Sequence, residues 1–228
     1  RLSPLGSRAS GISLGDRVYT AGSITGTYAE LCLCAARKVH PLPAKLSFEQ
    51  GAALWANYGT AFRALFQRGG AHAGETALIH GATGGVGIAA VQWARHFGMR
   101  VIASAGSSAG ETLLRDQGVE AVVSHRHGLQ PDEVLEATDG SGADLIIEML
   151  ANENLERDLD MLARGGRLVV VGSRGSIEMT PRKLMKREAD VRGLMLSGAS
   201  EDERREILSS IHAAGSTGAI APVIQRSI

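Results

Sequence analysis

The amino-acid sequence predicts an α/β protein built on a doubly wound parallel sheet, and three observations support this fold class. Short apolar segments alternate with amphipathic segments of helical period from Ala77 onward. A glycine-rich stretch, HGATGGVG, joins the first of the short segments to a helical one. Glycines follow several helical segments where a helix would end. Strands joined by helices of this length require right-handed crossovers, which place helices on both faces of a parallel sheet.

The expected strands are short runs rich in Val, Ile, Leu and Ala. They cover residues 77–80, 100–104, 121–124, 144–149, 167–171 and 190–196. The expected helices between and after them cover residues 88–97, 109–117, 132–138, 155–162, 183–188 and 201–212. Gly118 and the Gly165–Gly166 pair come directly after or soon after two of these helices, where a helix is expected to stop.

The part of the chain before this pattern is less regular. Residues 1–15 are rich in Ser, Gly and Arg and predict a loop, followed by a turn and a short strand up to Tyr19. Residues 26–33 alternate and predict a second strand, whereas the two prolines within 39–43 indicate an extended connector. Ser47 has the features of an N-cap and opens an alanine-rich helix. We expect that helix to stop or kink near 57–59 and to resume at Thr60.

Composition and charge exclude several classes of protein. The chain has 228 residues, of which 24 are basic and 24 acidic, so net charge does not favour nucleic acid or anionic lipid as a partner. The two cysteines, Cys32 and Cys34, are too close in sequence for a good disulfide and lack further ligands at zinc-finger spacing, so we expect a reducing compartment and no metal. No long apolar run or signal peptide is present, which favours the cytosol.

The glycine-rich turn predicts a phosphate-binding site. Glycines let the backbone approach a pyrophosphate, and the free amides and dipole at the start of the next helix attract the anion. The stretch is a variant of the dinucleotide fingerprint G-x-G-x-x-G, with Ala82 in place of the first glycine. The expected contacts are Thr83, Gly84, Gly85, Val86 and Gly87. The alternative is a turn whose glycines serve only tight packing.

The end of the second strand favours NADP over NAD. An NAD site usually carries an Asp or Glu there to hold the ribose hydroxyls, but residues 104–108 read SAGSS. Ser107, Ser108, His125 and Arg126 could instead donate to a 2′-phosphate; the alternative is that the serines are only turn residues. Glu148, which ends another strand, is expected to be a structural carboxylate paired with an Arg or a backbone amide.

Several blocks in order carry a resemblance to a known family: GDRV, GTYAE, the LSFEQGAAL helix, HGATGGVG, EMLAN and VVVGSRG. Together they resemble the zinc-independent quinone oxidoreductases, of the zeta-crystallin type, in the medium-chain dehydrogenase/reductase superfamily. The resemblance covers about residues 15–224. It implies a Rossmann fold, NADPH-dependent reduction of quinones such as ortho-quinones, a cytosolic homotetramer and no catalytic zinc. It also implies binding of AU-rich messenger RNA, which the charge balance alone does not suggest.

The resemblance also implies a set of cofactor contacts beyond the glycine turn, while it assigns no catalytic residue. Gly106 and His125 would lie by the adenosine ribose and its phosphate. The residues expected on the nicotinamide side are Asn154, Val171, Gly172, Ser173, Arg174, Leu194, Met195 and Leu196. Tyr58 and Thr60 lie where the family's helix approaches the cofactor.

The resemblance further implies a division into domains. Residues 49–198 would form the NADP-binding Rossmann domain, residues 1–48 a remnant of a GroES-like catalytic domain, and residues 199–228 a shortened return to that domain. We therefore expect a chain that is shortened relative to the family, with activity that depends on the lost part. Two alternatives remain: an enoyl thioester reductase of the same superfamily, and a non-catalytic NADPH-binding module that binds RNA.

Overall fold

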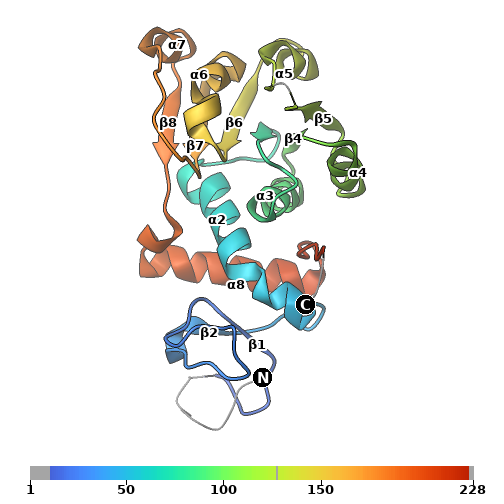
Figure 1. Cartoon of the computed structure of the whole chain (residues 1–228), viewed down its shortest axis with the longest axis vertical. Coiled ribbons are helices and arrows are strands. Elements are labelled where there is room, and N and C mark those ends of the chain that lie inside the picture. Colours follow the sequence, from blue (N-terminus) through green and yellow to red (C-terminus); the bar gives the residue numbers. More distant parts are fainter. Residues whose placement is uncertain (1–10, 127, 226–228) are drawn as a thin grey trace.

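The structure, a computed structural model, describes residues 11–126 and 128–225 (Figure 1). Its centre is a six-stranded parallel sheet in the order β5-β4-β3-β6-β7-β8. The strands are β3 (Thr76–Ile79), β4 (Arg100–Ala105), β5 (Ala121–Ser124), β6 (Ala143–Glu148), β7 (Leu162–Val170) and β8 (Asp190–Gly193). The order reverses between β3 and β6, which is the switch point of a doubly wound sheet. The predicted fold class is confirmed.

Helices cover both faces of the sheet, as predicted. The helices are α1 (Phe48–Ala52), α2 (Gly59–Phe62), α3 (Gly85–His96), α4 (Ser108–Asp116), α5 (Pro131–Ala137), α6 (Ala151–Met161), α7 (Pro181–Arg187) and α8 (Glu201–Thr217). Leu114 of α4 joins α3 and α2 in the larger apolar core, whereas Val134 of α5 and Leu159 of α6 belong to the core on the opposite face. Each of these helices therefore packs on the sheet through the apolar stripe that its sequence predicts.

The helical segment before the sheet does not break where the sequence predicts. Between α1 and β3 the chain forms two π-helical stretches, η2 (Leu54–Tyr58) and η3 (Arg63–Arg68), on either side of α2. Gly59 keeps right-handed helical angles, and a Cβ there would lie 3.5 Å from Ile207 of α8. A side chain at Gly59 would make ordinary van der Waals contacts, so packing does not require the glycine. The chain stays helical here, so the predicted stop near 57–59 is wrong, but the helix changes from π to α between Tyr58 and Gly59.

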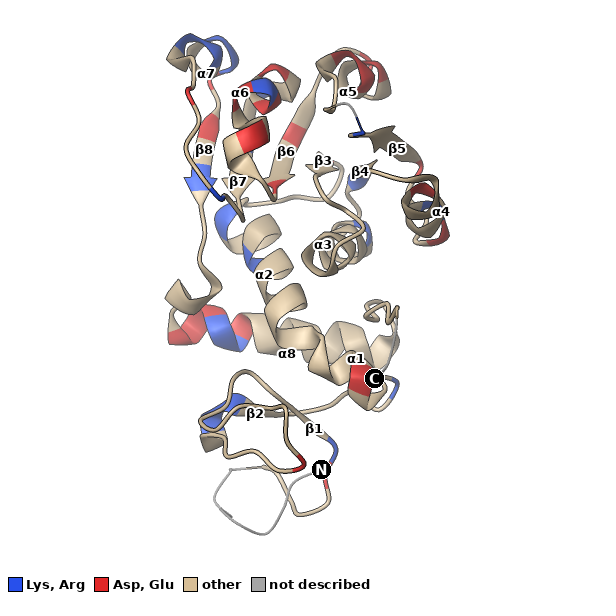
Figure 2. Cartoon of the chain, viewed as in Figure 1, with Lys and Arg blue, Asp and Glu red and all other residues tan. Residues whose placement is uncertain are grey.

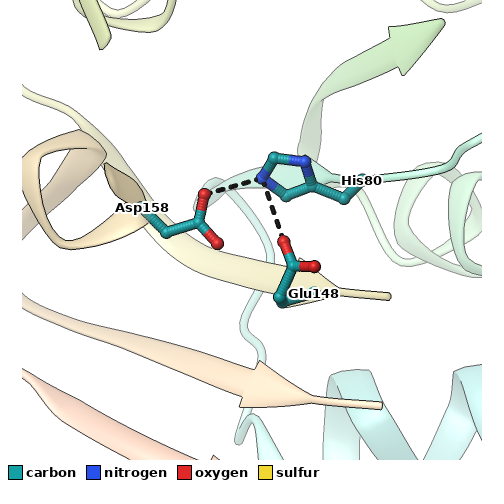
Figure 3. Close-up of side chains that lie close together, drawn as sticks. All are labelled: His80, Glu148 and Asp158. Carbon is teal, nitrogen blue, oxygen red and sulfur yellow. Dashed lines mark hydrogen bonds and ion pairs between the residues drawn. The ribbon is translucent and has the colours of Figure 1, made fainter. Parts of the chain in front are cut away.

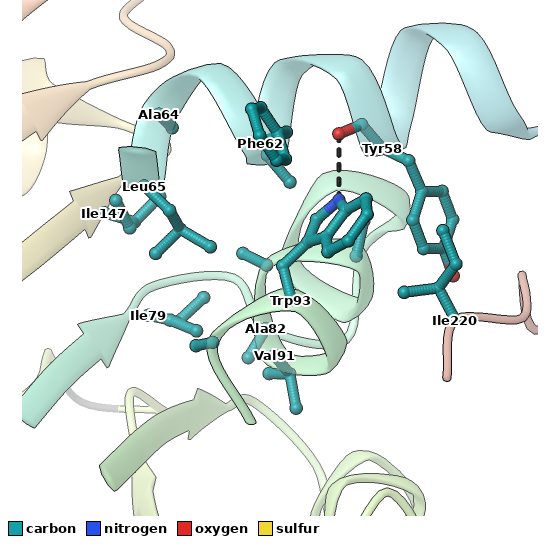
Figure 4. Packing of buried hydrophobic residues seen from close by; sticks show 14 of the residues in the cluster. Tyr58, Phe62, Ala64, Leu65, Ile79, Ala82, Val91, Trp93, Ile147 and Ile220 are labelled. Atoms are coloured by element: carbon teal, nitrogen blue, oxygen red, sulfur yellow. Dashed lines mark hydrogen bonds between the residues drawn. The ribbon is translucent and has the colours of Figure 1, made fainter. Parts of the chain in front are cut away.

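Trp93 of α3 is the largest fully buried side chain of the core (Figure 4). Its indole Nε1–H donates to the carbonyl oxygen of Tyr58 at 3.1 Å. Its ring meets Phe62 edge to face, with ring centroids 5.3 Å apart. A buried indole N–H needs such a partner, so this contact fixes the helical segment 54–68 against α3.

The N-terminal part pairs differently from the prediction. The strand β1 (Val18–Thr20) pairs antiparallel with β2 (Val39–Pro41), and the 3₁₀ turn η1 (Ala36–Lys38) precedes β2. The predicted strand at 26–33 is wrong, since these residues form bends and expose Tyr28 and Leu31. The predicted connector at 39–43 contains the real partner strand. Of the predicted loop 1–15, residues 1–10 lie outside the described residues.

Charged residues of both signs are spread along the described part of the chain (Figure 2). The basic helix α7 faces acidic groups of α6: Lys183 Nζ lies 2.9 Å from Glu156 Oε1 and 2.7 Å from Asp160 Oδ2. These ion pairs are half-buried at the surface, and they neutralise the basic helix locally. Among the described helices, none combines the length and the apolar character needed to cross a membrane.

Candidate functional site

The candidate site lies at the carboxyl edge of the sheet, beside the switch point between β3 and β6. The glycine turn follows β3, and Gly84 is the N-cap of α3 with no side-chain cap. The amide of Ile88 makes the first intrahelical hydrogen bond, to Gly84 O at 2.8 Å. The amides of the three residues before Ile88 therefore have no acceptor within the helix. Free amides at a helix N-terminus are groups that can bind an anion.

The glycines of the turn have different roles. A Cβ on Gly87 would lie 2.3 Å from the carbonyl oxygen of Gly81 and 2.6 Å from Ala82 Cα, so Gly87 serves packing of the turn itself. A Cβ on Gly85 would lie 2.8 Å from the Asn57 side chain. At Gly84 a Cβ would meet a single atom, the Gly81 carbonyl oxygen, at 3.3 Å, so this glycine is less tightly enclosed than Gly85 or Gly87. The packing alternative therefore holds for Gly87, whereas the uncapped helix start at Gly84 fits the anion-binding interpretation.

The ends of β4 and β5 lie together, as expected for one binding surface. His125 Nδ1 lies 3.2 Å from Ser104 Oγ, and a Cβ on Gly106 would lie 2.7 Å from His125 Nε2. Burial, helped by the neighbouring charge of His80, lowers the pKa of His125. Arg126 is exposed, and its Nε–H donates to the Gly106 carbonyl at 3.1 Å. The imidazole of His125 and the guanidinium of Arg126 thus flank Gly106, the residue that follows β4.

Ser107 has a structural role that the sequence analysis only partly anticipated. Its hydroxyl accepts a hydrogen bond from the Gly110 amide at 3.1 Å and caps α4. A Cβ on Gly110 would meet Thr83 Cγ2 at 2.9 Å, so the start of α4 packs directly against the glycine turn. Because a small N-cap residue precedes a helix that faces the turn, a phosphate group has a second helix start within reach.

A crevice of about 270 Å³ opens between the ends of β3, β5 and β6. Its walls include His80, His125, Leu129, Leu150 and Asn154. The resemblance assigns His125 to the adenosine and Asn154 to the nicotinamide side, but the structure brings both residues to one crevice. The position agrees with the rule that ligands of doubly wound sheets bind at the switch point.

The segment after β7 is fastened to the turn between β6 and α6. The amides of Val171 and Gly172 both donate to the Glu148 carbonyl, at 2.8 and 3.3 Å. A Cβ on Gly172 would lie 2.4 Å from Met149 O, so this position requires glycine. The Arg174 amide donates to Asn152 Oδ1 at 2.7 Å, and Ser173 Oγ lies 3.4 Å from the same oxygen. The predicted residues 171–174 therefore form one rim of the carboxyl edge.

Of the remaining predicted contacts, the structure brings some to the carboxyl edge of the sheet and others not. The Leu194 amide donates to Val170 O at 3.2 Å, and Met195 and Leu196 follow it beyond β8. Tyr58 is buried in the core, and its phenol donates to Gln92 Oε1 at 2.7 Å, so the structure does not bring the Tyr58 side chain to the carboxyl edge. Thr60 lies half-buried on α2. The residue of this helical segment that meets the glycine turn is Asn57, which the sequence analysis did not single out.

Three charged side chains meet behind the glycine turn in a cluster that the sequence analysis missed (Figure 3). His80 directly follows β3, Glu148 ends β6, and Asp158 lies in α6. His80 Nε2 lies 2.9 Å from Asp158 Oδ1 and 3.4 Å from Glu148 Oε2. Both carboxylates are fully buried and His80 nearly so. We call this group the buried cluster.

The buried cluster perturbs its own members. Burial raises the pKa of Glu148 to about 7, while the His80 charge opposes the rise and Asp158 adds to it. Burial alone would lower the pKa of His80, but the hydrogen bond to Asp158 and the charges of both carboxylates raise it. Glu148 also accepts hydrogen bonds from the Leu150 amide and, at 3.1 Å, from Asn154 Nδ2. The expected pairing of Glu148 with a backbone amide is therefore present, together with a contact to His80 that was not expected.

The buried cluster also has the composition of a metal site. One nitrogen and two carboxylate oxygens lie within 4.8 Å of one another, and zinc accepts such donors. The nitrogen-to-oxygen distance of 2.9 Å between His80 and Asp158 is that of a hydrogen bond, which a hydrogen-bonded ion cluster explains without a metal.

Comparisons with known proteins find similar sequences and similar folds. A protein-family model described as zinc-binding dehydrogenase matches residues 85–213. Quinone oxidoreductase of Homo sapiens is 42% identical over 220 residues, which cover 96% of this chain and 67% of that protein. The solved structure of the quinone oxidoreductase from Thermus thermophilus, described with its NADPH complex, aligns with a TM-score of 0.80 at 30% identity, over 94% of this chain and 69% of that one. JamJ enoyl reductase aligns with a TM-score of 0.77 at 26% identity, over 96% and 67%.

Proposed function

The chain belongs to the quinone oxidoreductase family, of the zeta-crystallin type, in the medium-chain dehydrogenase/reductase superfamily, and from this premise we propose that it binds NADPH and reduces quinones. The observation that carries the proposal is the uncapped helix start at Gly84, whose first amides have no acceptor within the helix and which lies beside the ends of β4 and β5. These features form a candidate anion-binding site with an adjoining crevice at the switch point of the sheet.

The residues present fit a phosphorylated dinucleotide. The amides at the start of α3 and the capped start of α4 can take phosphate oxygens. His125 and Arg126 lie beside Gly106, and the stretch 104–108 contains no carboxylate that would repel a 2′-phosphate. These features support NADPH over NADH. The bound nicotinamide would supply the hydride, and the residues of the chain would orient it and exclude water.

On this proposal the rim formed by residues 171–174 would hold the nicotinamide end. Its amides and carbonyls are fixed to the β6–α6 turn by the hydrogen bonds of Val171 and Gly172 to Glu148 O. Fixed backbone groups can orient a ring without moving when it binds. We also propose that residues 49–198 form the cofactor domain and that residues 1–48 and 199–228 belong to the second domain. Cytosolic location, a homotetramer and binding of AU-rich RNA stay predictions from the resemblance.

A second candidate reaction is reduction of an enoyl thioester, which the likeness to JamJ enoyl reductase favours. Both reactions would use the same NADPH-binding domain, so the substrate that accepts the hydride distinguishes them. Oxidation of NADPH would be followed with phenanthrenequinone and, in parallel, with a crotonyl thioester. We expect turnover with the quinone. Turnover with the thioester alone would replace the proposed reaction, and quenching of Trp55 or Trp93 fluorescence by NADPH without turnover of either acceptor would indicate a binding module.

A further inference from the structure

We propose that NADPH binding to this chain is coupled to the uptake of one proton by the buried cluster of His80, Glu148 and Asp158, with Glu148 as a positioning residue for the nucleotide crevice. The inference rests on the proposed function, because it takes NADPH as the ligand. It assigns a role to three buried ionisable groups that the proposed reaction does not use.

Glu148 connects the segments that surround the crevice. Its carboxylate accepts hydrogen bonds from the Leu150 amide and the Asn154 side chain, and both of those residues line the crevice. Its carbonyl holds Val171 and Gly172. The second carboxylate oxygen points to His80, which directly precedes the glycine turn (Figure 3). A change in the charge of the Glu148 side chain therefore acts on Leu150 and Asn154 on one wall of the crevice and on His80 on the other.

Charge counting shows why one proton decides the state of the buried cluster. With His80 protonated and both carboxylates ionised, the cluster carries one net negative charge in a buried position. With one further proton on a carboxyl group, it is neutral. Glu148 Oε2 and Asp158 Oδ2 are buried and have no hydrogen-bond partner among the described residues, so a proton between these side chains would satisfy both. Burial of an uncompensated charge costs free energy, which favours the protonated and neutral form of the buried cluster.

The coupling has a definite sign. Loss of the proton places a negative charge behind the turn that would hold the pyrophosphate, and like charges repel more strongly where water is excluded. Phosphate groups in the site therefore raise the pKa of the buried cluster, and binding takes up a proton. The pKa of about 7 for Glu148 sets the window in which the effect appears. NADPH affinity is thus expected to fall as pH rises through neutrality.

Other ionisable groups face the buried cluster and need to be separated from it. Arg157, beside Asp158 on α6, opposes the positive charge of His80. His125 lies across the crevice, and its lowered pKa places its own charge change at more acidic pH. The 2′-phosphate of NADPH also titrates. A useful experiment therefore compares two proteins at the same pH, so that contributions shared by both cancel.

The test measures the dissociation constant of NADPH, by tryptophan quenching, for the wild type and Glu148→Gln between about pH 6 and about pH 8.5. Glutamine keeps an oxygen for Leu150 and Asn154, and its amide can donate to Asp158, but it has no proton to lose. The two constants should agree at the acidic end, and the wild-type value should become about tenfold weaker relative to the variant at the basic end. Glu136→Gln, an exposed carboxylate of α5, is the control and should match wild type throughout.

The outcomes are distinct. A ratio of constants that stays flat across the pH range overturns the coupling while the proposed function stands. NADPH that binds neither protein at any pH overturns the proposed function and the coupling together. If circular dichroism shows that Glu148→Gln does not fold, Asp158→Asn takes its place, because it removes the other carboxylate and keeps an oxygen for His80. Its ratio to wild type should change with pH in the same direction, and a flat ratio contradicts the coupling.

Discussion

Arg167 of β7 and Glu75, the residue before β3, are joined by two hydrogen bonds between guanidinium and carboxylate, at 2.8 and 2.6 Å. Arg167 is 8% exposed and also donates to the carbonyls of Gly69 and Gly70 at the end of the helical segment. One side chain thus connects β7, the approach to β3 and the end of η3. A planar fork of donors is suited to this arrangement, and lysine cannot reproduce it.

Arg167→Ala should lower the free energy of unfolding by about 3 kcal/mol or more, because it leaves carbonyls and a carboxylate without their partner. Arg164→Ala is the matched control. Arg164 pairs with Glu188, but their side chains are 77% and 65% exposed, so its loss should cost less than about 1 kcal/mol. Urea unfolding of the two variants gives the comparison. Equal losses would show that the buried position of Arg167 adds nothing.

Gly87→Ala should abolish NADPH binding and destabilise the fold by about 2 kcal/mol or more. The added methyl group would lie within 2.6 Å of backbone atoms of Gly81 and Ala82, which cannot rotate away as a side chain can. Gly84→Ala meets only one atom at 3.3 Å and should keep the wild-type fold. Thermal unfolding and NADPH titration of both variants test the difference. A Gly87→Ala protein of wild-type stability would show that the turn tolerates a side chain there.

The sheet could be predicted from the sequence because its signals are local. Strands such as β3 and β6 have apolar centres, and Gly118 follows α4 as predicted, so the local signals agree there. The Gly165–Gly166 pair does not stop a helix, because α6 already ends at Met161 and both glycines lie in β7. The N-terminal part lacks this agreement. Residues 26–33 alternate as a strand would but form bends with Tyr28 exposed, while β2 contains His40 and Pro41, which carry no strand signal. Pairing with β1 decides that region, and pairing is not a local property.

The candidate site shows the same division. The glycine turn and the end of β4 were predictable because their residue types are required by backbone geometry at those positions. The buried cluster was not. Asp158 lies in the charged stretch NLERDLDM, where an acidic residue normally faces solvent, and only the packing of α6 against β6 buries it beside His80.

Ser107→Asp should shift cofactor preference from NADPH toward NADH. Aspartate caps a helix as well as serine does, so α4 should keep its cap and the free energy of unfolding should change by less than about 0.5 kcal/mol. The new carboxylate would repel a 2′-phosphate and accept from ribose hydroxyls. We expect NADPH to bind about tenfold more weakly, measured against NADH in the same titration. Ser107→Asn, which caps without charge, is the control and should leave the preference unchanged.

The loss of folding stability at acidic pH should depend on Glu75. Burial favours its neutral form, but the hydrogen bonds from Arg167 and from the His72 amide lower the pKa of Glu75 overall. The stabilisation is therefore present above the ordinary pKa of a glutamate and is lost as pH falls through the lowered value. Glu75→Gln should be less stable than wild type near neutrality, and the difference should shrink in acid. A difference that stays constant down to about pH 3 would contradict this assignment.

Glu148 should have the opposite effect on stability, because its pKa is raised from 4.5 to about 7 in the folded chain. The folded state then holds the proton more tightly than the unfolded state. The contribution is fully present below pH 4.5 and is lost as pH rises toward and through 7. The raised pKa of His80 acts in the same direction. Wild type should therefore lose up to about 3 kcal/mol relative to Glu148→Gln between about pH 4.5 and about pH 8.5.

Urea unfolding of both proteins at the two pH values measures this difference, and Glu136→Gln reports any general effect of removing a negative charge. The variant cannot ionise at residue 148, so its stability should change less with pH than that of wild type. Because the unfolding experiment contains no nucleotide, it tests the protonation of the buried cluster independently of NADPH. Parallel stability curves for wild type and Glu148→Gln would mean that Glu148 is ionised throughout, and the charge of the buried cluster would then have to be balanced by another group.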